Sequence, residues 1–507
     1  MNLFFSIIDK KINKRIFSLY SNVFLINYYQ FCYTILSSII CILFFFFFFS
    51  ITTSVFAQDS RIEKKIKKDS ISNISKEIQS QKKKNYPNLI SDAKNTINIL
   101  CSPKMEGRGY VNKGEQLAAS YIARQFEQIG LLKYKSSYFQ SFNLKSVNTF
   151  PKKIQLKSKK NTFQGGKDYL VASFSNAGKG KVGILYLDST FFENDSAQIA
   201  FNKVALKKSA VMYSDKWTKK IQQENPSFLE KIQEAKGVFV RTEKLIGVPS
   251  PVVYSKPYFE VLDSIFPIYE SLDLIDLQDL KAAKKEGKIS TLKFKVKSKL
   301  VESQPSQNVI GYIKGTKNSQ KVVVFSAHYD HLGKMGKDVY FAGANDNAAG
   351  VAMLLELAKY YSENPPDYSV AFMAFGSEEI GILGSMFYTQ NPLFPLKDIQ
   401  FLINLDLIGT GEEGATVVNA TIHKKEFELL KKINAENNYL KNIKSRGEAA
   451  NSDHYFFHKK RVPSFFIYLN GGSQAYHDIN DVPQNLSLFG YQNLYELLIE
   501  FSQGLMK

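Results

Sequence analysis

Near-continuous apolar runs, separated by amphipathic segments, dominate the C-terminal part of the chain. The runs are "VIGYI" (309–313), "KVVVFSA" (321–327), "SVAFMAF" (369–375), "IQFLINL" (399–405) and "SFFIYL" (464–469). Runs of this kind are typical of strands that are buried on both faces of a sheet. Helical spacing of apolar residues lies between them, for example at Val351, Leu354, Leu355 and Ala358. Strands that alternate with helices predict an α/β fold with a mostly parallel central sheet flanked by helices.

The chain before residue 308 has two different textures. Apolar residues from Leu117 to Ile129 fall on one helical face, and Gly130 follows as a stop signal. In 150–299, short apolar runs such as 182–187, 210–213 and 252–254 alternate with polar segments, and "LKFKVK" (292–297) alternates residue by residue, as a half-buried strand does. We therefore expect 86–149 and 300–507 to form one catalytic domain, with a β-rich domain inserted at 150–299.

The first 85 residues have the composition of an export signal and a tether. Basic residues come first, then an apolar stretch (35–49), and then "SVFAQ" with small or apolar residues up to Ala57. A retained membrane anchor is the alternative, but an apolar stretch this short falls below the roughly 20 residues that span a bilayer. We expect a signal peptide at 1–57 and a polar, Lys-rich tether at 58–85. The mature protein would then be periplasmic, on the cell surface or secreted, with no stable membrane anchor.

Charge and cysteine content narrow the possible functions. The 66 Lys and Arg residues outnumber the 47 Asp and Glu residues, which gives a net charge of +19. Beyond the leader and tether, the excess is spread as single Lys residues, without the clustered Arg of nucleic-acid-binding proteins, so nucleic acid is not an expected partner. Of the three cysteines, Cys32 and Cys41 lie in the leader. Cys101 is then alone in the mature chain and cannot form an internal disulfide.

Imidazole and carboxylate side chains gather at the ends of the predicted buried strands. All six histidines lie between residues 328 and 477. In chain order the motifs contain His328 and Asp330, then Asp346, then Glu378 and Glu379, then Asp406, and finally His477. Each motif alone is common in proteins. For example, an acidic pair after a strand often only stabilises the N-terminus of the next helix. Their succession at strand ends predicts one site at the carboxyl edge of the sheet.

The donor types indicate the metal. Imidazole and carboxylate groups without thiolate suit zinc, whereas a set made only of oxygen donors would suit magnesium or calcium. Two imidazoles and three carboxylates are more donors than one tetrahedral ion accepts. They fit two zinc ions that share a bridging carboxylate, as in two-metal hydrolases.

The order of these motifs resembles a known family. H-x-D, G-x-N-D-x-x-x-G, S-E-E-x-G-x-x-G-S, N-x-D-x-x-G and Y-H are similar to those of metallopeptidase family twenty-eight, the di-zinc aminopeptidases. The resemblance covers about 200 residues from Asn308, and extends weakly to "CSPKMEGRG" and the helix from Gly114. It implies the zinc exopeptidase fold, with a protease-associated-like insert at 150–299. It also implies peptide substrates, hydrolysed at the N-terminus by a water that bridges the two metals.

The resemblance also assigns roles to the ligands. Asp346 would bridge the two zinc ions. His328 and Asp406 would hold one ion, and Glu379 and His477 the other.

Further roles follow for the residues around the ligands. Asp330 would accept a hydrogen bond from the His328 imidazole and so orient it. Glu378 would be the general base, taking a proton from the attacking water and passing it to the leaving amine. Tyr476 would polarise the scissile carbonyl, with packing beside His477 as the alternative.

The other histidines have simpler interpretations. His331 has no ligand role in the family and is expected to be a loop contact near the site. His454, in "NSDHYFF", resembles part of the family's substrate pocket wall and is a candidate substrate contact. His423 and His458 are expected at the surface. Asn347 stands where some family members have a second aspartate, while the ligand position itself is kept.

Two other functions remain open for this fold. A receptor-like binding protein without peptidase action is one, although every ligand and Glu378 are present. Glutaminyl cyclisation at a single zinc is the other. The preferred N-terminal residue, the choice between aminopeptidase and carboxypeptidase, and the oligomeric state are not determined by the sequence.

Overall fold

The computed structural model describes residues 86–224, 226–266 and 291–507. The expected signal peptide (1–57) and tether (58–85) lie outside these residues. Within the described ranges, every helix is too short or too polar to cross a membrane.

The first sheet contains all five predicted strands, which the structure confirms as β10, β11, β14, β15 and β18. Its order is β1-β10-β14-β11-β15-β18-β16-β17. The four central strands, from β14 to β18 in that order, run parallel, while β1, β10 and β16 pair antiparallel with their inner neighbours. The bounds are β1 (Phe139–Thr149), β10 (Lys299–Ile313), β11 (Asn318–His328), β14 (Tyr368–Phe375), β15 (Ile399–Leu405), β16 (Gly414–Val418), β17 (Ile443–Ser445) and β18 (Ser464–Asn470).

Helices cover both faces of this sheet, which explains why its central strands are mostly apolar. On one face Phe325 and Phe372 lie against Tyr361 of α9 (Ala349–Glu363). On the other face the core contains Val324 together with side chains from α10 (Leu383–Gln390) and α12 (His454–Lys459). A strand buried on both faces gains stability from every side chain, because successive side chains point to opposite faces.

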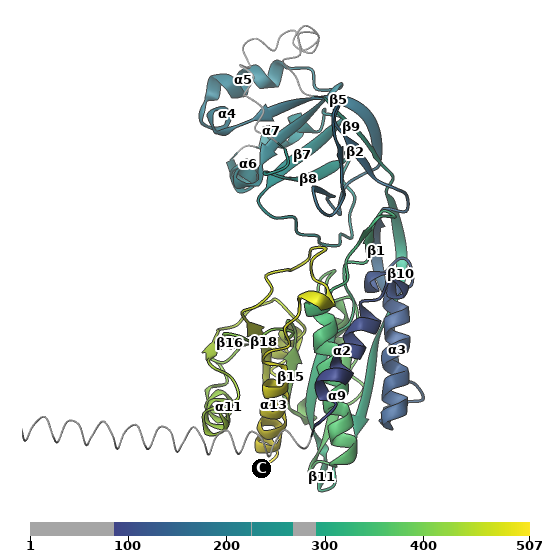
Figure 1. Cartoon of the computed structure of the whole chain (residues 1–507), viewed down its shortest axis with the longest axis vertical. Coiled ribbons are helices and arrows are strands. Elements are labelled where there is room, and N and C mark those ends of the chain that lie inside the picture. Colours follow the sequence, from purple (N-terminus) through teal and green to yellow (C-terminus); the bar gives the residue numbers. More distant parts are fainter. Residues whose placement is uncertain (1–85, 225, 267–290) are drawn as a thin grey trace, which may run out of the picture. The chain divides into compact units, whose positions relative to one another are not determined.

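Further helices complete this part of the fold (Figure 1). They are α2 (Leu89–Leu100), α3 (Gly114–Ile129), α11 (Lys424–Asn437) and α13 (Tyr491–Leu505), with a short 3-10 segment, η2 (Pro103–Arg108), between α2 and α3. The helix predicted before Gly130 is confirmed as α3. Gly130 adopts a left-handed conformation, with φ of 87°, and its N–H bonds back to the helix, as expected of a glycine C-cap.

The second sheet lies between β1 and β10 in the sequence. Its order is β3-β2-β9-β5-β6-β7-β8-β4. The strands are β2 (Gln155–Lys157), β3 (Thr162–Phe163), β4 (Tyr169–Val171), β5 (Gly178–Leu187), β6 (Ser209–Ser214), β7 (Gly237–Thr242), β8 (Tyr258–Leu262) and β9 (Thr291–Val296). The strand expected from "LKFKVK" is confirmed as β9, whose burial alternates along its length.

Four short helices, which the sequence analysis did not assign, accompany the second sheet. They are α4 (Ser189–Glu193), α5 (Asp195–Lys203), α6 (Thr218–Glu224) and α7 (Pro226–Ile232). Their Phe191, Phe201 and Phe228 share a core with Leu185 and Val211 of β5 and β6. The segment is therefore an α/β unit with its own apolar core.

The two sheets are joined through the β1–β10 pair. Thr149 at the end of β1 pairs with Lys299 at the start of β10, so the chain leaves the first sheet and returns to it at the same place. Further along, the parallel strands bring their carboxyl ends to one edge. His328 is the last residue of β11, and Asp406 directly follows β15. This edge carries the predicted site.

Candidate metal centre

His328 faces two carboxylates from different loops. Its Nε2 lies 3.2 Å from Oδ1 of Asp346 and 3.3 Å from Oδ1 of Asp406. Only 1% of the His328 side chain is exposed. The end of β11 therefore directs one imidazole nitrogen at two buried carboxylate oxygens.

His477 faces a second pair of carboxylates. Its Nε2 lies 3.0 Å from Oδ2 of Asp346 and 2.8 Å from Oε2 of Glu379. Asp346 thus presents one oxygen to His328 and the other to His477. This is the arrangement that a carboxylate bridging two ions requires.

The loop before α9 turns Asp346 toward both imidazoles. Gly343 has a φ of 61°, and a Cβ at this position would lie 2.3 Å from the Asp346 carbonyl oxygen, so only glycine fits. Gly350 lies inside α9. Glycine is needed there for close approach, because a Cβ would lie 2.2 Å from Oδ1 of Asn347. Asn347 itself donates to the Leu405 carbonyl at 2.9 Å, so it braces the loop against β15.

Asp330 holds the backbone of the two glutamates. Its Oδ1 accepts the Glu378 N–H at 3.0 Å, and its Oδ2 accepts the Glu379 N–H at 3.1 Å. The Tyr110 hydroxyl donates to the same Oδ2 at 2.7 Å. The nearest nitrogen of His328 lies 3.8 Å from Asp330, so the hydrogen bond expected between them is not formed.

The pKa values of the side chains in this cluster shift in different directions. Burial alone would raise the pKa of Asp346, but hydrogen bonds from His328 and His477 hold it well below its usual range. Burial would lower the pKa of His477, whereas the Glu379 and Asp346 carboxylates raise it to about 11. The pKa of Glu378 is well above its ordinary value because of burial and the Glu379 charge, partly opposed by His328. A carboxyl group in such surroundings is suited to holding and releasing a proton.

The donor set fits zinc by its geometry. Zinc bonds of about 2.0–2.1 Å to nitrogen and oxygen place neighbouring tetrahedral ligands about 3.3 Å apart. The nitrogen–oxygen separations at His328 and His477 run from 2.8 to 3.3 Å. Each Nε2 carries at most one proton yet faces two carboxylate oxygens. A shared cation satisfies such an arrangement better than a proton does.

Three other residues selected from the sequence, His331, Tyr476 and His454, differ in their contacts with this cluster. His331 is fully buried, and its Nδ1 lies 2.7 Å from Oε1 of Glu379, so it directly contacts a candidate ligand. Tyr476 is 41% exposed and stacks on His477. His454 is completely buried against Phe466 and does not join the cluster, and its substrate contact stays a prediction.

The other two histidines do not belong to the cluster. His423 and His458 are half-buried rather than fully exposed, and their rings contact each other.

The sequence analysis missed two buried charged residues behind Asp346, namely Arg108 and Asp481. Arg108 is completely buried and donates to carbonyls in both ligand loops. Asp481 is 1% exposed and accepts the N–H groups of Asn345 and Asp346. Their only signal in the sequence was position, in "MEGRGY" and four residues after His477.

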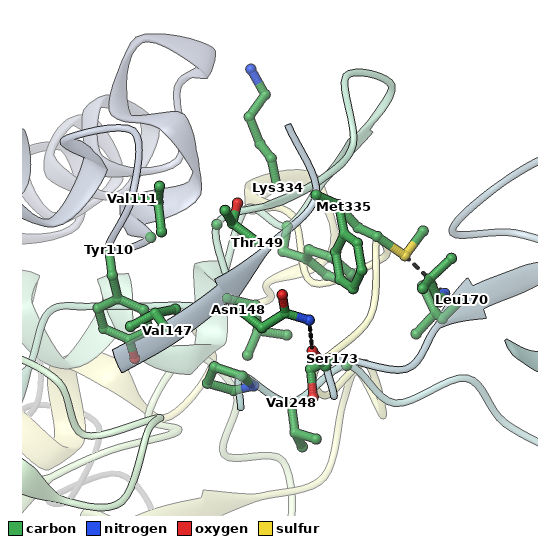
Figure 2. Close-up of a pocket in the computed structure, with 18 of the residues that line it drawn as sticks. Tyr110, Val111, Val147, Asn148, Thr149, Leu170, Ser173, Val248, Lys334 and Met335 are labelled. Carbon is green, nitrogen blue, oxygen red and sulfur yellow. Dashed lines mark hydrogen bonds between the residues drawn. The ribbon is translucent and has the colours of Figure 1, made fainter. Parts of the chain in front are cut away.

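Tyr110, whose hydroxyl bonds to Asp330, also lines a cavity of about 840 Å³, a volume that includes open solvent. Figure 2 shows Tyr110 and Val147 on one side and Leu170 and Met335 on the other. None of the clustered carboxylates or imidazoles lines it. Tyr110 therefore contacts both this cavity and Asp330 beside the candidate metal centre.

The sheet and the cluster at its carboxyl edge define an α/β protein with a candidate metal centre. Residues 308–502 match the model of Peptidase family M28. The resemblance predicted from the motifs is confirmed over this segment.

Individual relatives support the same family over part of their length. Aminopeptidase YwaD of Bacillus subtilis (strain 168) is 33% identical over 174 residues, covering 33% of this chain and 37% of that protein. A vacuolar membrane protease of Candida glabrata is 31% identical over 125 residues, covering 24% of this chain and 12% of that protein. Each alignment spans less than two thirds of the relative's length.

A solved structure extends the likeness to more of the chain. BSAP, a zinc aminopeptidase from Bacillus subtilis, superposes with a TM-score of 0.57 at 20% identity, covering 82% of this chain and 94% of that chain. At this identity the likeness shows the fold. The mixed α/β fold class expected from the sequence is confirmed.

Proposed function

We propose that this chain is an exported zinc-dependent aminopeptidase that removes N-terminal residues from peptides. The observation that carries the proposal is the orientation of Asp346, whose two oxygens face His328 and His477 separately. The match of residues 308–502 to the model of Peptidase family M28 supports it.

The proposed ligands divide between two zinc ions. His328 and Asp406 would hold one ion, Glu379 and His477 would hold the other, and Asp346 would be shared between them. Each proposed pair already faces a different oxygen of Asp346. Bound zinc supplies Lewis-acid polarisation of a carbonyl group and makes water more acidic.

The chain's own residues supply proton transfer and orientation. Glu378 takes a proton from the attacking water and gives it to the leaving amine, for which its raised pKa is suited. Asp330 keeps Glu378 in place through the backbone N–H of that residue. Tyr476, with its exposed ring beside His477, is positioned to meet the substrate carbonyl.

We assign residues 150–299 to a protease-associated-like insert that shapes access to the site without supplying a ligand. The Gly247 N–H of this segment donates to the His477 carbonyl at 2.8 Å, so the segment reaches the ligand loop. A zinc-loaded crystal structure with a metal bond from this segment would contradict the assignment.

The test uses purified protein with zinc and a panel of aminoacyl chromogenic amides, N-terminally blocked peptides and N-terminal glutaminyl peptides. We expect hydrolysis of free N-terminal substrates, loss of activity with a chelator, and about two zinc ions per chain by elemental analysis. Cleavage of blocked peptides from the carboxyl end would indicate a carboxypeptidase. Cyclisation with one zinc would indicate a glutaminyl cyclase, and zinc binding without turnover a receptor. Export is tested separately by fractionating expressing cells.

A further inference from the structure

Arg108 lies behind the candidate metal centre with every donor engaged. Its Nε donates to the Tyr329 carbonyl at 2.8 Å, in the loop that carries His328 and Asp330. Its Nη1 donates to the carbonyls of Leu100 at 3.1 Å and Ala342 at 2.7 Å. Its Nη2 donates to those of Gly343 at 2.7 Å and Asp346 at 3.3 Å. All five guanidinium N–H groups therefore bond to main-chain carbonyls.

Asp481 holds the same loop from its N–H side. Its Oδ1 accepts the Asn345 N–H at 2.8 Å, and its Oδ2 accepts the Asp346 N–H at 3.0 Å. Asp481 follows His477 by four residues, so one short segment carries both a candidate ligand and this brace. The main chain of Asp346 is thus bound at its N–H by a buried carboxylate and at its carbonyl by a buried guanidinium.

Burying the two charged side chains of Arg108 and Asp481 costs free energy. A buried ion loses several kcal/mol of hydration, and a paired partner normally offsets much of that loss. Neither Arg108 nor Asp481 has an ion-pair partner in the part of the chain that the structure describes; their charges are compensated by main-chain dipoles of the ligand loops. Such bonds fix the direction of the peptide units, and therefore that of the Asp346 side chain.

We propose that Arg108 and Asp481 are positioning residues that preset the Asp346 carboxylate for two metal ions, so that they determine metal affinity in addition to local stability. The inference rests on the proposed di-zinc function. It extends that function to residues that make no contact with the metal-facing atoms. Groups that orient ligands in this way typically change metal affinity by about 10–100-fold when they are replaced.

The decisive variant is Asp481→Asn. An asparagine has nearly the same shape, but it offers one acceptor oxygen and turns an N–H₂ group toward one of the two loop N–H groups. Zinc affinity is measured by competition with a chromogenic chelator on metal-free protein whose fold is checked by circular dichroism. We expect a zinc dissociation constant about 10–100-fold above that of the wild type, and a smaller rise in Tm when zinc is added.

The matched control is Asp478→Asn, the same substitution three residues earlier. Asp478 is 9% exposed, accepts the Asn480 N–H at 2.7 Å and lies 3.8 Å from Nζ of Lys244, and among the described residues its side chain has no hydrogen bond to the Asp346 loop. We expect its zinc affinity to stay within about twofold of the wild type, since no orienting contact is lost.

Arg108→Lys is the second variant, because an ammonium keeps the charge but has three donors instead of five. Its control is Arg241→Lys, at a 6% exposed arginine that pairs with Asp263 in the second sheet. The Arg108 variant should lose zinc affinity, and the Arg241 variant should lose stability only. If Arg108→Lys does not fold, Asp481→Asn alone decides.

The outcomes separate this inference from the proposed function. Wild-type protein that binds no zinc would overturn both. Wild-type zinc binding together with unchanged zinc affinity in Asp481→Asn would overturn the positioning role and leave the function intact. The positioning role would also be overturned if the variant loses equal Tm with and without zinc, because a purely structural brace stabilises both forms alike.

Discussion

Glu378→Gln separates proton transfer from metal binding at two adjacent glutamates. The amide is nearly isosteric with the carboxyl group, and the contact that fixes this position uses the Glu378 main-chain N–H, bound to Asp330 at 3.0 Å. That hydrogen bond survives the substitution. Among the described residues, neither His328 nor His477 forms an ion pair with the Glu378 side chain, whereas Nε2 of His477 lies 2.8 Å from Oε2 of Glu379. We therefore expect zinc content and affinity near those of the wild type.

The magnitude follows from the role of the lost group. General base catalysis contributes about 10²–10⁴-fold to turnover, which corresponds to about 2.7–5.4 kcal/mol of transition-state stabilisation. We expect kcat of Glu378→Gln to fall by at least this factor, with a smaller change in KM.

Glu379→Gln is the matched control, because its Oε2 lies 2.8 Å from Nε2 of His477. This variant should lose zinc and activity together. The assay combines steady-state hydrolysis of an aminoacyl chromogenic amide with elemental analysis of the same preparations. A Glu378→Gln enzyme with full zinc and wild-type kcat would refute the proton-transfer role.

Three further outcomes are expected. Removing zinc with a chelator should lower Tm and abolish hydrolysis. Zinc returned to about 1,000 times its dissociation constant should restore about 4 kcal/mol of stability. A Tm that does not change with zinc concentration would contradict a zinc site in the folded protein. Burial raises the pKa of Glu115 from 4.5 to about 8, so its contribution to stability is complete below about pH 4.5 and is lost as the pH rises through about 8. Glu115→Gln should therefore gain stability relative to the wild type at pH 9 but not at pH 4.5 in urea unfolding, and a pH-independent difference would be inconsistent with this. Tyr110→Phe removes the hydroxyl 2.7 Å from Asp330 and should cost about 1.5–3 kcal/mol in the same unfolding assay; a loss below about 0.5 kcal/mol would show that the bond is of little consequence.

The local pattern of apolar and polar residues was sufficient to predict the main helices and strands and to select the candidate site residues. The run that became β11 has four consecutive apolar residues at 322–325, so burial on both faces followed from the sequence alone. The face that became α3 and the glycine after it defined a helix and its end. Parallel strands bring their carboxyl ends to one edge of a sheet, so side chains as distant in sequence as His328 and His477 could be predicted to meet.

Only the tertiary structure decided which atoms face one another and what holds them there. No sequence pattern shows that Asp330 bonds the main chain of the glutamates instead of His328. The buried positions of Arg108 and Asp481 were equally hidden, because an arginine or aspartate in a loop is usually exposed. Both depend on main-chain groups brought together across 238 and 135 residues of chain. Periodicity reports only the neighbours a residue has along its own helix or strand, whereas these bonds exist only once distant loops have packed together.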